Sequence, residues 1–259
     1  MKKLIRSIVL FFGYDFVKVT KANKTIKSKD LTLYETKTGN FYLPTEAKSD
    51  VVAQAMINNE VFEKEVVDIA KKYIQPGTAI LDVGSNFGQM TVLFSKHVGE
   101  QGKVFAFDAD DFVFDVLKKN IAANNCKNVI PTFGAVHNKA DEILLFPEQD
   151  FVEFQTYGSY GIDYTATNGR KVKSLTIDSL NITEKISFMK IDIQGGDLQA
   201  MQGAIATINK NQMPIIFEYE YHYEEKFKMN FQQYVDFVAS INYKFERVIN
   251  GHNYLILPK

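Results

Sequence analysis

The sequence predicts a Rossmann-like α/β fold, built on a mostly parallel sheet that ends in an antiparallel hairpin. Two observations carry this prediction. From residue 62 onward, short apolar runs of strand length alternate with amphipathic helical segments, and such alternation requires crossover connections between parallel strands. The last two predicted strands, 243–249 and 254–257, are joined by a turn at Asn250-Gly251 that is too short for a crossover, so this pair must be antiparallel.

The predicted elements follow one another in a regular order. Apolar residues at helical spacing predict a helix from Phe62 to Tyr73, which Gln75-Pro76-Gly77 ends. The same patterns place strands at 79–84, 103–107, 128–133, 186–193 and 214–219, and helices at 90–98, 112–123, 198–208 and 231–240. Residues 140–170 interrupt this order with two further strand-like pieces, so we expect an insertion there. Ser159 and Tyr160 within it belong either to a lid over a ligand or to a plain hairpin.

The chain divides into an N-terminal extension, residues 1–50, and a main domain, residues 51–259, that carries the insertion. The extension is expected to be a helix plus a hairpin packed on the core, because residues 31–43 alternate around Thr38-Gly39-Asn40. Residues 1–20 mix basic side chains with Phe11-Phe12. This mixture is typical of a surface or interface helix, and the alternative is a weak contact with a membrane surface.

Composition limits the class of protein. With 46% hydrophobic and 24% charged residues, the chain is typical of a soluble globular protein. Basic and acidic residues nearly balance, 30 against 31, so no nucleic-acid partner is expected. Cys126 is the only cysteine, which excludes an intrachain disulfide and agrees with the cytoplasmic location that we expect. The sequence leaves the oligomeric state open.

A cofactor site is predicted where the first strand of the main sheet ends. There, Asp82-Val83-Gly84-Ser85-Asn86-Phe87-Gly88 runs from the strand into a helix. Gly84 and Gly88 permit a tight turn and a close backbone approach, and Asn86 tolerates left-handed geometry. The next strand ends on Asp108, whose carboxylate can accept hydrogen bonds from both hydroxyls of a ribose.

The loop distinguishes between two cofactors. A dinucleotide site requires G-x-G-x-x-G, with the pyrophosphate at the helix N-terminus, whereas this loop has Gly84-x-Asn86-x-Gly88. Asp82 adds a carboxylate that would repel a pyrophosphate but suits the zwitterionic methionine end of S-adenosyl-L-methionine (SAM). SAM is therefore predicted as the cofactor and S-adenosyl-L-homocysteine (SAH) as the product. NAD, or a tight turn without a ligand, remains as the alternative.

The loop at 80–88 resembles the D-V-G-A-N-x-G segment of the FkbM-type SAM-dependent methyltransferases. Other family segments have counterparts along the chain: Asp108-Ala109 for Glu-Pro, Asn120, Ala135, Thr176–Leu180 for T-L-D-x-L, Lys190–Asp197 for K-I-D-V-E-G-x-E, Gly203-Ala204, and Pro214–Glu218 for P-x-I-x-x-E. The resemblance covers residues 62–220 and implies a class I methyltransferase fold, SAM as donor, and an acceptor hydroxyl on a sugar or a polyketide-like molecule. It also implies cofactor contacts from Asp82, Gly84, Ser85, Asn86, Gly88, Asp108, Ala109, Ala135 and Asp192. Gln194 departs from the family's Glu, and Gly196-Asp197 from its x-Glu.

Catalytic candidates lie at the ends of the fourth and fifth strands, which border the methyl group in this architecture. Asp192 is the first choice, as a general base or an anchor for the acceptor hydroxyl, with a helix cap as the alternative. Lys190 could pair with Asp192, polarise an acceptor oxygen, or form a structural ion pair. Glu218 could orient an acceptor hydroxyl or end its strand in a salt bridge. His222, in an aromatic cluster, could act as a base beside a stacked sugar or be structural.

These residues predict O-methylation of a hydroxyl on a sugar, glycan or related small molecule. The alternatives are methylation of nitrogen or carboxylate, and a SAM-binding partner protein without catalysis, which Gln194 keeps open. No metal is predicted, because the four histidines are scattered without paired spacing. Mg²⁺ held by Asp192, Glu218 and Glu220 is the minor alternative.

Overall fold

The computed structural model describes residues 30–47, 49–147 and 156–259. Its centre is a seven-stranded sheet in the order β11-β12-β10-β9-β3-β4-β5. The strands are β3 (Ala79–Val83), β4 (Lys103–Asp108), β5 (Val129–Phe133), β9 (Ile186–Ile191), β10 (Ile215–Glu218), β11 (Tyr243–Ile249) and β12 (Asn253–Pro258). The helix and the membrane contact predicted for the first residues lie outside the described residues.

The sheet confirms the predicted fold class. Strands β5, β4, β3, β9 and β10 are parallel, and β12 is antiparallel to both β10 and β11. The chain adds strands in one direction from β3 to β5 and then returns to place β9 on the other side of β3. Ligands of such sheets bind beyond the carboxyl ends of the strands at this reversal.

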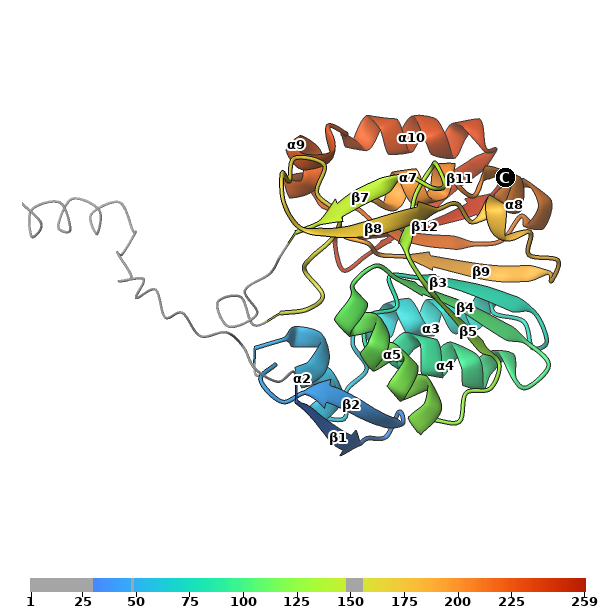
Figure 1. Ribbon diagram of the computed structural model, residues 1–259. Coiled ribbons are helices and arrows are strands. Elements are labelled where there is room, and N and C mark those ends of the chain that lie inside the picture. The colour runs from blue at the N-terminus through green and yellow to red at the C-terminus, as the bar shows by residue number, and fades with distance from the viewer. Residues whose placement is uncertain (1–29, 48, 148–155) are drawn as a thin grey trace, which may run out of the picture.

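Helices cover both faces of the sheet (Figure 1). One face carries α3 (Lys64–Tyr73), α4 (Gln89–Val98) and α5 (Asp111–Ala123), and the other carries α7 (Asp197–Gln202), α8 (Ile205–Asn211) and α10 (Phe231–Ser240). Side chains alternate along β3, so that Ile80 joins the first core and Leu81 the second. Every residue of β3 is buried, as expected for a parallel strand with helices on both sides.

The helix predicted at 198–208 is two helices, α7 and α8, that break at Gly203. A Cβ atom at Gly203 would lie 2.0 Å from the backbone oxygen of His137, so the chain passes too close there for any side chain. Asp178, in the short helix η1 (Asp178–Leu180), then accepts hydrogen bonds from the backbone N–H groups of Ala206 and Thr207. This carboxylate satisfies the first turn of α8.

A smaller sheet in the order β6-β8-β7 stands beside the carboxyl ends of the main strands. It consists of β6 (Ala135–Val136), β7 (Ile143–Phe146) and β8 (Arg170–Leu175). Arg170 ties this sheet to the start of α5, through ion pairs with Asp110 at 2.6 Å and with Asp111. Residues 156–164 run without helix or strand between β7 and β8.

An N-terminal hairpin of β1 (Leu31–Glu35) and β2 (Asn40–Pro44) packs against α5. The buried Asn120 of α5 exchanges hydrogen bonds with the backbone of Tyr42 and donates another to the oxygen of Phe87. Asp50 caps α2 (Val51–Ile57) and also accepts a hydrogen bond from the N–H of Tyr157 at 2.7 Å. The N-terminal elements are thus fastened both to the cofactor loop and to the insertion.

The other short elements are η2 (Tyr221–Tyr223) and α9 (Glu224–Phe227), which follow β10. In the part of the chain that the structure describes, no helix has the length and apolarity that crossing a membrane requires.

Candidate functional site

The loop after β3 adopts the tight turn that its residues predict. Gly84 has a φ of 80°, and a Cβ atom there would lie 1.8 Å from the backbone oxygen of Asp192. Asn86 has a φ of 49°, and its side-chain oxygen accepts a hydrogen bond from the N–H of Phe87. The N–H groups of Gly84 and Ser85 both donate to the oxygen of Phe107, at 3.0 and 2.9 Å. The loop is therefore held against β4 and β9 before any ligand arrives.

Asp108, at the end of β4, joins this loop through its carboxylate. One oxygen accepts a hydrogen bond from the N–H of Asn86 and the other from the N–H of Asp110, both at 2.9 Å. Burial, the largest effect, raises the pKa of Asp108 to about 7. Each carboxylate oxygen can accept a further hydrogen bond, so the group remains available to the hydroxyls of a ribose.

A first cavity, whose space including its open mouth is about 780 Å³, lies beside Asp108. Its floor is the carboxyl ends of β3 and β4 and the turn after β5, and the insertion closes it from above. It is lined mainly by apolar and aromatic side chains, among them Phe107, Val113, Val136, Leu144, Phe146, Tyr157, Tyr160, Ile162, Tyr164 and Phe227, and by Gly84, Asn86, Asp108, Ala109, Ala135 and Asp192. An apolar wall beside the Asp108 carboxylate fits an adenosine, because the base is flat and the ribose carries two hydroxyls.

Asp82 lies beneath the loop rather than in either cavity, and it is fully buried. One of its carboxylate oxygens accepts a hydrogen bond from Thr91, and the other has no hydrogen-bond partner among the described residues. The ammonium group of Lys190 stands 4.0 Å from that second oxygen. Burial raises the pKa of Asp82, and Lys190 opposes this effect.

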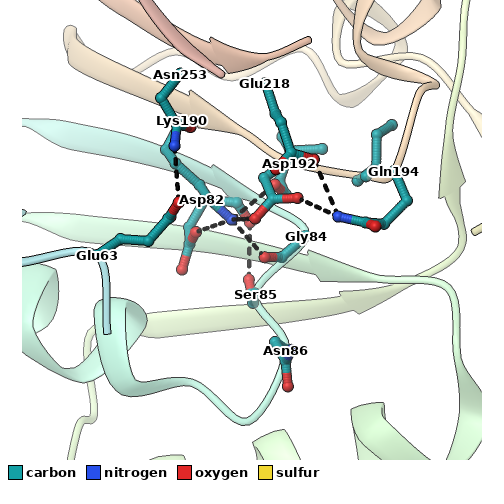
Figure 2. A network of polar contacts seen from close by, with 12 residues as sticks. Glu63, Asp82, Gly84, Ser85, Asn86, Lys190, Asp192, Gln194, Glu218 and Asn253 are labelled. Atoms are coloured by element: carbon teal, nitrogen blue, oxygen red, sulfur yellow. Dashed lines mark hydrogen bonds and ion pairs between the residues drawn. The ribbon is translucent and has the colours of Figure 1, made fainter. Parts of the chain in front are cut away.

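Lys190 is a buried cation at the centre of the site, only 4% exposed (Figure 2). Its ammonium donates to the backbone oxygen of Gly84 at 2.7 Å and lies 3.5 Å from the carboxylate of Asp192. Burial alone would favour the neutral amine, but the carboxylates of Asp192 and Asp82 outweigh it and raise the pKa of Lys190. The neighbouring carboxylates therefore favour the charged ammonium, which holds the loop through its hydrogen bond to Gly84.

Asp192 and Glu218 are joined by the amide of Gln194. The side-chain nitrogen of Gln194 donates to both carboxyl groups at 3.0 Å, and the hydroxyl of Tyr223 donates to its oxygen at 2.6 Å. Burial and then repulsion from Asp192 raise the pKa of Glu218 well above its ordinary range. These surroundings favour the protonated form of Glu218, and an amide at 194 supplies donors that a carboxylate could not.

Asp197, the other departure from the family pattern, connects the ends of β9 and β10. Its fully buried carboxylate accepts hydrogen bonds from the N–H of Glu218 at 3.1 Å and the N–H of Ile193 at 3.4 Å. Burial, followed by repulsion from Asp192, raises its pKa to about 7. This side chain fixes the spacing of the two strand ends that carry the catalytic candidates.

A second cavity, of about 840 Å³, lies on the other side of the loop, and Ser85 and Gly88 line it rather than the first. Gly84, Asn86, Asp192 and Gln194 border both cavities. The charged and titratable side chains along the second cavity are Glu63, Lys190, Asp192, Glu218, Glu220 and His252.

The structure brings Lys190, Asp192 and Glu218 together but leaves His222 outside both cavities. The His222 side chain is 52% exposed and lies 3.5 Å from Glu220, at an open hollow on the surface. Glu63 and His252 reach the second cavity although sequence reasoning did not select them. No motif marks either residue, because each is brought there only by the packing of α3 and of the turn before β12.

No group of three or more potential metal ligands occurs within residues 30–47, 49–147 and 156–259.

Comparisons with known proteins add a family assignment to this geometry. The model of the "Methyltransferase FkbM domain" matches residues 82–245, and that of the "Protein-L-isoaspartate(D-aspartate) O-methyltransferase (PCMT)" matches residues 13–138. The former covers more than half of the chain and includes the cofactor loop, Asp192 and Glu218.

Individual relatives match over shorter segments. The chain is 31% identical over 81 residues to a "Probable cobalt-precorrin-6B C(15)-methyltransferase (decarboxylating)" of Sulfurisphaera tokodaii, covering 31% of this chain and 42% of the relative. It is 31% identical over 83 residues to a demethylmenaquinone methyltransferase of Symbiobacterium thermophilum, covering 32% of each. The matches thus span less than half of the length of these relatives. Among solved structures, the methyltransferase FkbM of Methylobacillus flagellatus KT aligns with a TM-score of 0.46 at 13% identity, covering 82% of this chain and 56% of that one.

Proposed function

The chain belongs to the FkbM methyltransferase family, and from that premise we propose that it transfers the methyl group of SAM to a hydroxyl of a sugar, glycan or related small molecule. The observation that carries the proposal is the placement of two cavities on either side of Gly84, with Asp192 bordering both. One cavity has the chemistry of a nucleoside site, and the other has the polar groups that an acceptor requires.

The first cavity would hold SAM. Its aromatic wall would receive the adenine, and Asp108 would accept hydrogen bonds from the ribose hydroxyls. Asn86 and Gly84 border both cavities, so the methionine end would lie along the loop that Lys190 holds. When bound, SAM supplies a methyl group on a positively charged sulfur, which is already activated for transfer.

Alignment of the acceptor with that methyl group is the main task of the protein, and it can supply up to about 7–11 kcal/mol of the barrier. Asp192 would accept the proton of the acceptor hydroxyl, which adds about 10²- to 10⁴-fold. The bond formed is O–C, and the bond broken is C–S, whose electron pair stays on sulfur. Lys190 would hold Asp192 in place through their 3.5 Å contact, and neutral Glu218 would donate a hydrogen bond to Asp192 or to the acceptor oxygen.

The second candidate is a SAM-binding protein without methyl transfer, and the replacement of the family's Glu by Gln194 is the reason to consider it. The family pattern has Glu at this position, and an amide cannot serve as a base there. Its two hydrogen bonds to Asp192 and Glu218 support the catalytic proposal instead, because they orient the carboxyl groups that would act on the acceptor.

Measurements of SAM binding and of methyl transfer distinguish these two candidates. Calorimetry with SAM and SAH tests the cofactor, and failure of the purified protein to bind either would refute the proposal. Incubation with methyl-labelled SAM and a panel of nucleotide sugars and glycolipids tests the reaction, and analysis of the product distinguishes oxygen, nitrogen and carboxylate as the methylated atom. SAM binding without turnover on the panel, unchanged in an Asp192→Asn variant, would favour the non-catalytic candidate.

A further inference from the structure

Glu63 has a largely buried carboxyl side chain beside the second cavity and has no part in the proposed reaction. It lies between α2 and α3, ahead of the segment that matches the family model. Its side chain is only 9% exposed and lines the second cavity. One carboxylate oxygen, Oε1, accepts a hydrogen bond from Asn253 at 2.7 Å and lies 3.4 Å from His252 Nε2. The other oxygen, Oε2, is buried without a hydrogen-bond partner in the described part of the chain.

The side chain of Glu63 does not cap α3, which is the structural role expected of a residue that precedes a helix. Glu63 is the N-cap of α3, yet its side chain makes no capping hydrogen bond. Its backbone has φ 46° and ψ 48°, the left-handed conformation that disfavours residues other than glycine, asparagine and aspartate. Strained positions of this kind cluster at ligand contacts, where the surrounding structure holds them in place. Asn253, across the site on β12, holds Glu63 here (Figure 2).

The charges around the second cavity limit what Glu63 can bind. Glu63, Asp192, Glu218 and Glu220 line it with carboxyl groups. Lys190 is the buried cation there, and Gly84 and the carboxylates of Asp82 and Asp192 already engage it. A ligand carboxylate or phosphate would meet like charge from Asp192 and Glu220 and would leave Glu63 Oε2 without a hydrogen-bond donor, and both effects weaken binding. A group that donates hydrogen bonds would satisfy that oxygen.

We propose that Glu63 anchors the acceptor, by accepting on Oε2 a hydrogen bond from a hydroxyl or an ammonium group, and that the second cavity rejects acceptors with an anionic group at that point. This inference rests on the proposed function, because it concerns the acceptor of the same reaction. It adds a binding residue that precedes the segment matched by the FkbM family model, and it narrows the acceptor to neutral or amino sugars.

The test measures binding of three sugars to the SAH-saturated protein by calorimetry: methyl glucoside, the corresponding amino sugar and the corresponding uronic acid. The variants are Glu63→Gln, which keeps the shape and one acceptor oxygen, and Glu63→Ala. The control is Glu65→Gln, because Glu65 is 39% exposed and pairs with Arg247 outside both cavities. The glucoside and the amino sugar distinguish a hydroxyl from an ammonium group as the partner.

We expect at least one of the two non-anionic sugars to bind, with the uronic acid at least about tenfold weaker. Both Glu63 variants should weaken that binding by about tenfold or more, whereas Glu65→Gln should match the wild type. All variants should bind SAH like the wild type, because Glu63 does not line the first cavity. Equal binding of the uronic acid, absence of binding by all three sugars, or unchanged affinity in Glu63→Gln would overturn the inference. Failure of the wild-type protein to bind SAH would instead refute the proposed function.

Discussion

Replacing Lys190 with methionine should destabilise the protein strongly, because it removes the cation shared by the buried carboxylate of Asp82 and the partly buried carboxylate of Asp192. Lys190 is 4% exposed, its ammonium lies 4.0 Å from Asp82 and 3.5 Å from Asp192, and Asp82 is fully buried. Removing one partner of such a pair costs about 3–5 kcal/mol. At about 2–4 °C per kcal/mol for a domain near this size, Tm should fall by roughly 6–20 °C.

The loss should depend on pH with a defined sign. Burial already raises the pKa of Asp82, and without Lys190 that pKa rises further. A carboxyl group whose folded pKa is raised favours folding at low pH, and this stability is lost as pH rises through the folded pKa. The gap in Tm between wild type and Lys190→Met should therefore be widest near pH 8 and narrow toward pH 5.

Thermal unfolding followed by circular dichroism at both pH values measures this effect. Lys103→Met is the matched control, because Lys103 pairs with Glu184 on the exposed surface, and its loss should cost less than about 1 kcal/mol. Adding Asp82→Asn to Lys190→Met should recover part of the stability, by removing the unpaired charge. A Lys190→Met protein that unfolds within about 2 °C of the wild type at pH 8 would refute the assignment of Lys190 as a required buried cation.

Three further substitutions test the rest of the site. Asp108→Asn should weaken SAH binding about tenfold at pH 8. Because the pKa of Asp108 is about 7, the affinity of the wild type for SAH should fall between pH 8 and pH 6, while that of the variant stays constant. If calorimetry shows the same pH dependence of affinity for both proteins, Asp108 does not bind the ribose. Asp192→Asn should lower methyl transfer from labelled SAM by about 10²- to 10⁴-fold with SAH affinity nearly unchanged, and full activity would exclude Asp192 as the base. Gln194→Glu replaces two donated hydrogen bonds with a third carboxyl group beside Asp192 and Glu218. Tm should therefore fall at pH 8 and recover toward pH 5 as that group takes up a proton. A higher Tm at pH 8 would contradict the proposed hydrogen bonding of Gln194 to the two carboxyl groups.

Local sequence patterns were sufficient to predict the turn in the loop after β3. The glycine spacing after the first strand predicts a tight turn, and Gly84 and Asn86 both have positive φ. The rule that the carboxyl ends of parallel strands meet at one edge also predicted that Lys190, Asp192 and Glu218 would lie together, as they do. Their chemical roles remain predictions.

The sequence did not predict which residues Asp82 and His222 would lie beside. Asp82 was expected to face the cofactor, but it lies beneath the loop beside Lys190. His222 falls within an aromatic run that looked suited to a sugar, but its side chain points into an open surface hollow. Burial and partner identity depend on how neighbouring strands stack, and hydrophobic periodicity does not encode this.

The sequence by itself determined the fold class, the family and the tight turn after β3, because each of these is marked by short segments of residues close together along the chain. Only the tertiary structure brought Glu63 to Asn253, 190 residues away in sequence, and left one oxygen of Glu63 buried without a partner. This contact forms where the residue before α3 meets the first residue of β12, so no local pattern of residues marks it.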